Sequence, residues 1–238
     1  MSSHNKLVVL ILCGGKGTRL GLKFKNNNKS LIKIKNKTLI SSNIHYLFNQ
    51  NFSNIFVLTG HAHKKVEKEV KKNFKKKVFL HYTGINSSIT SRIKKTLKLL
   101  DKFQYVLIMN GDSLYKFNLN KIFFETFSKN IDCSFICTSK TIKYGFLKIN
   151  YKKEVKSFTK NEKISSFLNK NEHLFYSGVC FIKNELLKKY LEKIKKNFEL
   201  NIFNKLIKKN KTKVFLDNGE FKDFNNLEDM QDLKKISF

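Results

Sequence analysis

LVVLILCGGKGTRL, residues 7–20, is the stretch that decides how this chain folds. Its apolar run from Leu7 to Leu12 is typical of a buried strand, and four of the chain's ten glycines fall between positions 14 and 21, directly after that run. Backbone N–H groups exposed by glycines at the end of a strand can surround phosphate oxygens. The stretch therefore predicts a strand that runs into a phosphate-binding loop.

The order of residues in this loop separates it from the common nucleotide motifs. No Gly-Lys-Ser/Thr follows at the spacing of a Walker A loop, and the Gly-x-Gly-x-x-Gly dinucleotide fingerprint is absent. Gly14, Gly15 and Gly17 let backbone N–H groups approach triphosphate oxygens. Thr18 can donate its hydroxyl, and Arg19 can clamp a departing pyrophosphate. The alternative is an ordinary strand-to-helix turn, which needs only one or two glycines.

Arginine is rare in this chain, which gives its two arginines weight. Lysine supplies the other 46 of 48 basic side chains, and proline and tryptophan are absent, a usage typical of a coding sequence rich in A and T. An arginine that persists in such a composition indicates a site that needs a planar, bidentate donor. Arg19 and Arg92 are therefore the first functional candidates, against the alternative that both persist by chance.

The composition of the whole chain favours one folded α/β domain over residues 1–238, because 41% hydrophobic content is enough to bury a full core. The net charge of +30 comes from lysines spread from end to end, which predicts non-specific binding to polyanions but no specific nucleic-acid site. No apolar run approaches the ~20 residues of a membrane helix, and no signal peptide is recognisable, so we expect a soluble cytoplasmic protein that does not bind membranes. The cysteines are expected to be reduced core thiols: Cys13, Cys133, Cys137 and Cys180.

Short apolar runs alternate with amphipathic stretches in the first half of the chain, which predicts βαβ units and a mainly parallel, Rossmann-like sheet flanked by helices. The expected strands there are 6–13, 54–60, 77–82 and 104–110, with helices at 38–50, 63–73 and 90–101. After about residue 130 strands dominate, which predicts a small, mixed-sheet second lobe built on the first. Its expected strands are 131–138, 144–151, 155–159, 174–183, 212–217 and 220–224, with helices at 184–195, 198–209 and 226–236.

Polar residues follow three of the expected parallel strands, in loops that begin at Gly14, Thr83 and Asn110. Because ligands of such sheets gather at the carboxyl ends of the strands, we expect the three loops to face one crevice. Asp112, in Asn110-Gly111-Asp112, is a candidate Mg²⁺ ligand, since Mg²⁺ is commonly held by one or two carboxylates together with substrate phosphates. The alternative is a strand-ending turn in which the aspartate acts as a local cap.

Two residues far from Asp112 in sequence could complete the same site. Asp223 lies between two aromatic residues at an expected strand end, so it can turn inward to share the metal or belong to a turn ahead of the last helix. Lys29 could add a point charge to the same phosphates, although many lysines lie nearby. We expect His61 and His63, at a predicted strand end, to line the crevice or begin a helix rather than to bind metal.

Together these features resemble the sugar-1-phosphate nucleotidylyltransferases, also called nucleotide-sugar pyrophosphorylases, over nearly the whole chain. Leu12-Cys13-Gly14-Gly15-Lys16-Gly17-Thr18-Arg19-Leu20 matches the opening motif of that family, and Lys29-Ser30-Leu31 resembles its Pro-Lys-x-Leu segment. Tyr144-Gly145 and Tyr176-Ser177-Gly178-Val179 resemble motifs that line the sugar site. Lys160 or Lys163 replaces the lysine of a Glu-Lys-Pro segment that meets the sugar phosphate.

The resemblance implies the fold of the nucleotide-diphospho-sugar transferases, with a nucleotide-binding half over about 1–130 and a sugar-binding half over about 131–238. It implies an Mg²⁺-dependent reaction that joins a nucleoside triphosphate to a sugar 1-phosphate in nucleotide-sugar and polysaccharide biosynthesis. Arg19 and Lys29 would be catalytic, and Asp112 and Asp223 would hold the metal. The nucleotide would contact Leu12, Cys13, Gly14, Gly15, Gly17, Thr18, Thr83, Gly84, Ser87, Arg92 and Gly111. The sugar phosphate would contact Tyr144, Gly145, Lys160, Lys163, Tyr176, Ser177 and Gly178.

The stretch from Thr83 to Lys94 most resembles the Thr-Gly-x-x-Ser/Thr-x-Thr-Gly-Gly-Arg segment of glucose-1-phosphate cytidylyltransferases, with Arg92 on its arginine and Thr90-Ser91 in place of its glycines. The resemblance therefore favours CTP. The alternatives are dTTP, GTP or UTP with another sugar such as heptose 1-phosphate, or a catalytically impaired homologue. A basic nucleic-acid-binding protein is a more distant alternative, since the sequence has no basic-aromatic platform. A homo-oligomer is compatible with the sequence.

Overall fold

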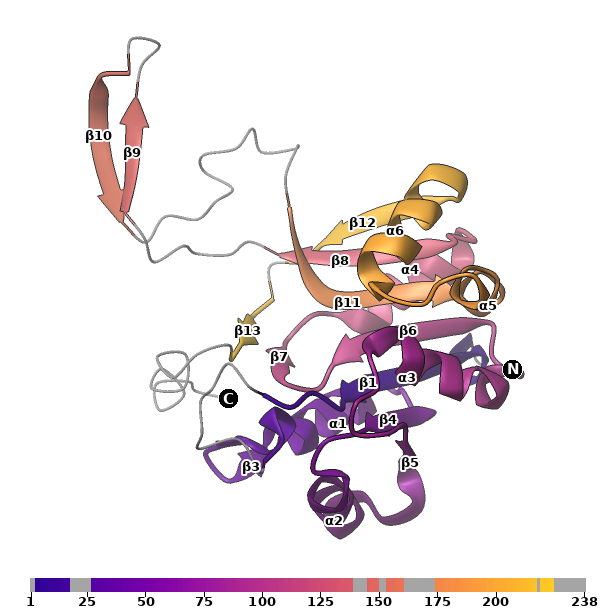
Figure 1. Cartoon of the computed structure of the whole chain (residues 1–238). Coiled ribbons are helices and arrows are strands. Elements are labelled where there is room, and N and C mark those ends of the chain that lie inside the picture. The colour runs from indigo at the N-terminus through magenta and orange to yellow at the C-terminus, as the bar shows by residue number, and fades with distance from the viewer. Residues whose placement is uncertain are drawn as a thin grey trace.

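The structure, a computed structural model, describes residues 3–17, 27–138, 145–149, 153–160, 174–217 and 219–224 (Figure 1). The helix predicted over 226–236 lies outside these residues.

A seven-stranded sheet forms the centre of the fold, with strand order β12-β8-β11-β6-β1-β4-β5. Its strands are β1 (Leu7–Cys13), β4 (Ile55–Thr59), β5 (Phe79–Tyr82), β6 (Tyr105–Asn110), β8 (Cys133–Thr138), β11 (Phe175–Lys183) and β12 (Thr212–Leu216). β1 pairs in parallel with β4 and β6, β4 with β5, and β8 with β12. Only β11 runs antiparallel to its neighbours in this sheet, β6 and β8. The sheet is therefore mixed and mainly parallel, which confirms the predicted class.

Residues of β1 alternate between the two faces of the sheet, and each face carries its own hydrophobic cluster. Leu7, Val9 and Ile11 join a cluster with residues of three helices, α1 (Leu39–Asn49), α2 (His63–Phe74) and α4 (Leu119–Ser128). Val8 and Leu10 join a cluster with residues of α3 (Ile89–Thr96), α5 (Asn184–Glu192) and α6 (Phe198–Lys209). Because helices cover both faces, β1 has no polar side, and this explains its unbroken apolar sequence.

Within the described ranges, three short antiparallel pairs lie outside the central sheet. They are β2 (Lys33–Ile34) with β3 (Lys37–Thr38), β7 (Ser113–Tyr115) with β13 (Phe221–Asp223), and β9 (Gly145–Ile149) with β10 (Val155–Lys160). The short 3-10 turns among the described residues are η1 (Ser3–Lys6), η4 (Lys29–Leu31), η5 (Lys75–Lys77) and η6 (Leu97–Leu100). Figure 1 shows β9 and β10 standing clear of the central sheet.

The predicted elements agree closely with the observed ones. Every predicted strand matches an observed strand to within two residues at either end. The helix predicted over 90–101 instead ends at Thr96 and continues as η6, and the helix predicted over 184–195 ends at Glu192. Neither α4 and β7 nor the two-residue strands β2 and β3 were predicted from the sequence, although β7 helps to build the candidate site.

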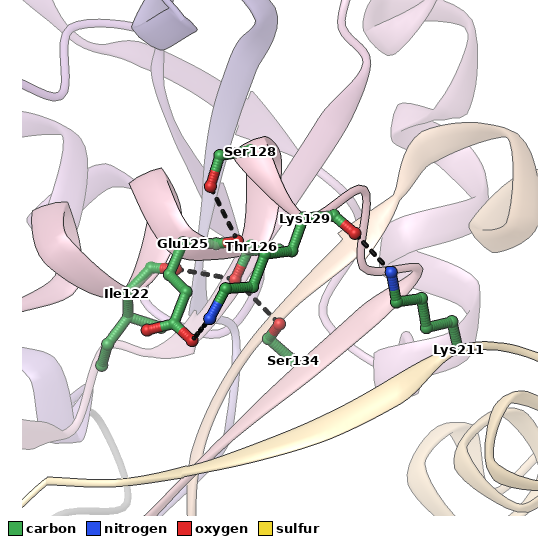
Figure 2. Close-up of polar contacts among 7 residues, drawn as sticks. All are labelled: Ile122, Glu125, Thr126, Ser128, Lys129, Ser134 and Lys211. Atoms are coloured by element: carbon green, nitrogen blue, oxygen red, sulfur yellow. Dashed lines mark hydrogen bonds and ion pairs between the residues drawn. The ribbon is translucent and has the colours of Figure 1, made fainter.

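Hydroxyl groups as well as apolar side chains hold α4 to the sheet (Figure 2). Thr126 Oγ1 donates to the carbonyl oxygen of Ile122 at 2.7 Å and lies 2.8 Å from the hydroxyl oxygen of Ser134 on β8. At the end of the helix, Lys211 Nζ donates to the carbonyl oxygen of Lys129 at 2.5 Å. These contacts join α4, β8 and the segment before β12.

The four cysteines are buried and form no disulfide bond, as predicted. Within the described ranges, no helix has both the length and the apolar character needed to cross a membrane.

Candidate functional site

The carboxyl ends of β1, β4, β5 and β6 lie at one edge of the sheet, because these strands run parallel. Backbone hydrogen bonds join neighbouring strand ends there. The N–H of Gly111 donates to the carbonyl oxygen of Leu12 at 3.1 Å, and the N–H of Thr83 donates to that of Thr59 at 2.9 Å. The three polar loops therefore begin at the same edge of the sheet, and the expectation that they face one crevice stays a prediction.

The described part of the glycine loop contains Gly14, Gly15 and Gly17, whereas Thr18 and Arg19 lie outside the described residues. The carbonyl oxygen of Gly14 accepts a hydrogen bond from Nη2 of Arg92 at 2.7 Å. Gly17 lies against Lys29, because a Cβ added to Gly17 would lie 3.2 Å from Cγ of that lysine. The loop thus contacts both Arg92 and Lys29, two cationic residues that the sequence analysis had singled out.

The loop from Thr83 to Arg92 is tied together by its own side chains. Thr83 Oγ1 donates to the carbonyl oxygen of Thr59 at 2.7 Å, and the Ser87 hydroxyl donates to that of Thr83. Nε and Nη2 of Arg92 donate to the carbonyl oxygen of Ser87 at 3.1 and 2.8 Å. Gly84 has a φ of 102°, which favours glycine. Thr83 and Arg92, both predicted to contact nucleotide, therefore direct side-chain donors at the protein backbone.

Asn28, which the sequence analysis did not single out, fixes the end of β1. Its Nδ2 donates to the carbonyl oxygens of Cys13 at 2.9 Å and His61 at 3.0 Å, and its Oδ1 accepts from the N–H of Ser30 at 3.0 Å. One side chain thus connects the glycine loop, the turn after β4 and the start of η4. The sequence offered no signal for this role, because Asn28 ends a run of three asparagines in an asparagine-rich chain.

Lys29 reaches from the glycine loop toward the C-terminal part of the site. Its side chain is buried, and Nζ donates to the carbonyl oxygen of Phe224 at 3.1 Å. Phe224 directly follows Asp223. The lysine therefore links the predicted phosphate-binding loop to the strand that carries a predicted metal ligand.

The pairing of β7 with β13 brings the two predicted metal ligands together. Asp223 lies opposite Ser113 in the register, and Ser113 directly follows Asp112. Both aspartates line one pocket of about 280 Å³. Two carboxylates suit Mg²⁺, which takes one or two of them together with substrate phosphates and water. A denser group of three or more His, Cys, Asp or Glu side chains suited to a metal does not occur among the described residues.

The wall of this pocket comes largely from β11. Tyr176, Ser177 and Gly178, which were predicted to meet the sugar phosphate, line it together with the two aspartates. Gly178 lies where a bulge interrupts β11, has a φ of 81°, and would place an added Cβ 2.5 Å from Nδ2 of Asn110. Glycine at this position therefore lets the bulge bring β11 close to the end of β6.

Glu199 is a third carboxylate in the pocket, and the sequence analysis missed it. It lies in the first turn of α6, whose buried Phe198 and Ile202 anchor the helix in the core. Partial burial raises the pKa of Glu199, although the residue as a whole is exposed, and no hydrogen bond or ion pair joins its carboxylate to the described residues. An acidic residue at a helix start is common, because it complements the helix dipole, and so it gave no distinct signal.

The other predicted sugar-phosphate residues are not brought to this pocket by the described structure. Gly145 begins β9 and lies opposite Lys160, the last residue of β10. Figure 1 shows their hairpin away from the strands that form the pocket. Tyr144 and Lys163 lie outside the described residues. The roles of these four residues therefore stay predictions.

Cys13, the last residue of β1, has a buried thiol that lies against Gly111 in the loop after β6. Burial raises its pKa to about 12. A Cβ added to Gly111 would lie 2.1 Å from its Sγ, so glycine at 111 leaves room for the thiol. A thiol with so high a pKa is protonated at neutral pH and does not act as a nucleophile.

His61 and His63 lie where the sequence placed them. Both line a pocket of about 580 Å³ together with Tyr82 and Ile85, and His63 is the first residue of α2. The N–H of His61 donates to the carbonyl oxygen of Gly14 at 3.3 Å, so the pocket adjoins the glycine loop.

Two sequence comparisons bear on this site. The family model described as Nucleotidyl transferase matches residues 8–235. D-glycero-alpha-D-manno-heptose 1-phosphate guanylyltransferase from Campylobacter jejuni is 28% identical over 116 residues, which is 48% of this chain and 51% of that protein. The chain thus matches about half the length of this curated relative.

Solved structures share the fold. A protein from Bacillus anthracis assigned as a glucose-1-phosphate thymidylyltransferase, in complex with sucrose, has a TM-score of 0.75 and 16% identity, covering 98% of this chain and 97% of that one. HddC from Yersinia pseudotuberculosis, complexed with GMP-PN, has a TM-score of 0.70 and 20% identity, covering 95% and 97%. At these identities the likeness is one of fold.

Proposed function

Because the chain belongs to the nucleotidyl transferase family, we propose that it transfers a nucleotidyl group from a nucleoside triphosphate to a sugar 1-phosphate and releases pyrophosphate. The observation that carries this proposal is the pairing of β7 with β13, which puts Asp112 and Asp223 in one pocket. Lys29 connects the backbone beside Asp223 to the glycine loop. A phosphate-binding loop next to paired carboxylates suits a reaction between two phosphate groups.

The proposed chemistry needs no nucleophile from the protein. An oxygen of the sugar phosphate attacks the α-phosphorus of the triphosphate in line, and a new oxygen–phosphorus bond forms. The bond from the α-phosphorus to the oxygen that bridges to the β-phosphorus breaks, and pyrophosphate leaves with the electron pair. The attacking oxygen is already anionic, so no side chain has to remove a proton. Catalysis then depends on alignment and on neutralisation of charge.

The residues near the glycine loop serve the leaving group. Lys29 and Arg19 stabilise the charge that develops on pyrophosphate, and the glycine backbone holds the phosphates. Asp112 and Asp223 would hold Mg²⁺, which when bound neutralises phosphate charge and orients the phosphate oxygens.

The sugar belongs on the β11 side of the pocket in this proposal. Tyr176 to Gly178 form the wall against it, and the carboxylate of Glu199 is placed to accept hydrogen bonds from its hydroxyl groups. Tyr144, Gly145, Lys160 and Lys163 are proposed for the sugar phosphate on the sequence resemblance alone.

Two pairs of substrates have support. The resemblance of residues 83–94 to cytidylyltransferases favours CTP with glucose 1-phosphate. The Campylobacter jejuni relative is named a guanylyltransferase for heptose 1-phosphate, which favours GTP with a heptose phosphate. Arg92 does not decide between them, because the backbone of Gly14 and Ser87 occupies its Nε and Nη2 donors and its Nη1 is buried.

The test is a substrate panel. The purified protein is incubated with Mg²⁺, with ATP, CTP, GTP, UTP or dTTP, and with glucose, mannose or heptose 1-phosphate, and pyrophosphate release is followed. We expect release with one pair of substrates, together with the matching nucleotide sugar in the mass spectrum. Triphosphate binding without turnover on any pair would favour the catalytically impaired homologue, and failure to bind any triphosphate would contradict the proposal.

A further inference from the structure

Arg92 joins two loops of the site through a nearly buried guanidinium group, with 5% of the residue exposed. Nη2 donates to the carbonyl oxygens of Gly14 at 2.7 Å and Ser87 at 2.8 Å, and Nε donates to Ser87 at 3.1 Å. Nε and Nη2 of the planar guanidinium group thus share the carbonyl oxygen of Ser87, and Nη2 also bonds to the glycine loop through Gly14. Lysine cannot reproduce this arrangement.

Two glycines make room for this guanidinium group. A Cβ added to Gly14 would lie 0.7 Å from Nη1 of Arg92, and one added to Gly60 would lie 2.5 Å from the same atom. Neither glycine has a positive φ, so the backbone conformation at both positions would accept alanine. Space for Arg92, rather than backbone freedom, therefore explains why position 14 is glycine. At position 60 an added Cβ would also lie 2.9 Å from the carbonyl oxygen of Gly84, so both neighbours require glycine there.

The contribution of Arg92 to folding does not by itself explain its placement. Nη1 is buried and has no hydrogen-bond partner among the described residues. Burial also lowers the pKa of the guanidinium group, which means that the surroundings disfavour its charge. A buried charged donor without a partner lowers stability. A buried guanidinium group next to a loop that binds an anion is instead favourable for binding. It holds the loop backbone in one conformation, and its positive charge attracts the anion.

We propose that Arg92 is a positioning residue that presets the glycine loop for the triphosphate by fixing the carbonyl groups of Gly14 and Ser87. The inference rests on the proposed function. In this proposal Arg92 acts by fixing the loop and does not contact the base. Glycine at position 14 provides the space that the guanidinium group occupies.

The test compares Gly14→Ala, Arg92→Ala and the double variant, first without ligand. We expect Gly14→Ala to lower the unfolding midpoint by about 4 °C or more, because the new methyl group meets the guanidinium group. In the Arg92→Ala background the same substitution should lower the midpoint by less than half as much. If Gly14→Ala alone does not fold, recovery of folding in the double variant gives the same result.

Gly15→Ala is the matched control, because a Cβ added there meets nothing within 4 Å. Its effect on the midpoint should be the same with Arg92 present or replaced. Coupling to Arg92 at position 14 but not at position 15 would assign the effect to the guanidinium contact and not to glycine loss in general.

The functional test measures the effect of the Arg92 substitutions on the triphosphate and on the sugar phosphate separately. Arg92→Ala and Arg92→Lys should each weaken binding of the Mg²⁺ complexes of CTP or GTP by about tenfold, measured by thermal-shift titration. In turnover, the KM for the triphosphate should rise by a similar factor while the KM for the sugar phosphate stays unchanged. A residue that only supports the fold would not produce this split.

Two results would overturn the inference: equal effects of Gly14→Ala in both backgrounds, or wild-type triphosphate affinity in Arg92→Lys. Absence of triphosphate binding by the wild-type protein would instead overturn the proposed function. The midpoint comparison needs no ligand and would still support or overturn the contact between Arg92 and Gly14.

Discussion

Three carboxylates, Asp112, Asp223 and Glu199, share one pocket in a chain that has 48 basic and 18 acidic residues. No lysine or arginine appears among the described residues that line this pocket. The described lining of this pocket therefore differs in composition from the lysine-rich chain as a whole. Carboxylate oxygens are the ligands that Mg²⁺ prefers in proteins, which is why the two aspartates are the residues to test for a metal role.

Asp112→Asn and Asp223→Asn should each lower turnover about 10²–10³-fold. Each substitution keeps the size of the side chain and removes the charge that would hold Mg²⁺, so the fold should persist. Pyrophosphate release measures the effect, and the unfolding midpoint checks the fold. Asp101→Asn makes the same chemical change at an exposed ion pair with Lys188 and should leave turnover unchanged. Undiminished turnover in both pocket variants would remove the metal role.

Glu199→Gln should raise the KM for the sugar 1-phosphate about tenfold and leave the KM for the triphosphate unchanged. The charged carboxylate accepts hydrogen bonds from sugar hydroxyls more strongly than an amide oxygen does. Initial rates with each substrate varied in turn give both constants. Glu185→Gln is the matched control, since Glu185 also lies in the first turn of a helix, α5, but does not line the pocket. A similar rise in both variants would point to a helix-dipole effect instead of sugar binding.

Most elements of the fold could be predicted from the sequence, because strong hydrophobic periodicity marked them. α4 was not predicted because its hydrophobic residues do not follow the helical period. Phe124 lies on its outer side with 67% of its surface exposed, next to the fully buried Phe123. The short strand β7 has too few residues to show a period. Nothing local indicates that β7 pairs with β13, whose residues lie more than a hundred positions later.

Some residues of the candidate site could likewise be predicted from the sequence, and others could not. The glycine loop, Lys29 and the two aspartates stood out because motif and position agreed, although Thr18 and Arg19 lie outside the described residues. Asn28 and Glu199 did not stand out, since their roles depend on which distant backbone or pocket their side chains meet. Arg92 was singled out for its rarity, but its contact with Gly14 could be seen only in the folded chain.

Asp132 connects three strands of the sheet. Its carboxylate pairs with Lys183 at the end of β11, with Nζ 2.6 Å from Oδ1, and accepts from the N–H of Lys211 before β12 at 2.9 Å. Burial acts to raise the pKa of this carboxyl group, but the contacts with Lys183 and Lys211 outweigh burial and lower it below its usual 3.8. The charged form therefore stabilises the folded state.

Asp132→Asn should lower the free energy of unfolding by about 1–3 kcal/mol at pH 7. Because the folded-state pKa is below the unfolded one, this stabilisation is complete above about pH 4 and is lost as the pH falls through the folded-state value. Urea unfolding at several pH values should show the difference from wild type narrowing below about pH 4. Asp101→Asn, at the exposed pair with Lys188, should cost less than about 1 kcal/mol. A pH-independent difference would mean that side-chain shape, not charge, matters.

At the scale of the whole molecule, the sheet separates two hydrophobic clusters, and each contains cysteine. Cys13 lies in the cluster on the α1 side, and Cys133, Cys137 and Cys180 lie in the other. Burial raises the pKa of Cys13 and Cys180 to about 12 and that of Cys137 to about 11. The thiols therefore report on both halves of the core.

A thiol reagent such as an aromatic disulfide should modify none of the four cysteines within minutes at pH 8 in the native protein, and all four in urea. The physical reason is that the reagent needs both access and the thiolate, and burial withholds both. Absorbance of the released group counts the modified thiols. Rapid modification of a single thiol would reveal local opening around it, and mass spectrometry of peptides would identify which face of the sheet had opened.

The position of β11 has a consequence for how the protein is made. This strand lies between β6 and β8 in the sheet, yet it follows both of them in the chain. While a ribosome is still adding residues beyond β8, the edges of β6 and β8 that β11 will occupy have no partner, and such bare edges pair readily with other chains. During synthesis there is thus a stage in which β6 and β8 each have one unpaired edge, because residues 175–183 have not yet been made. Chaperones that shield strand edges would act at this stage of translation.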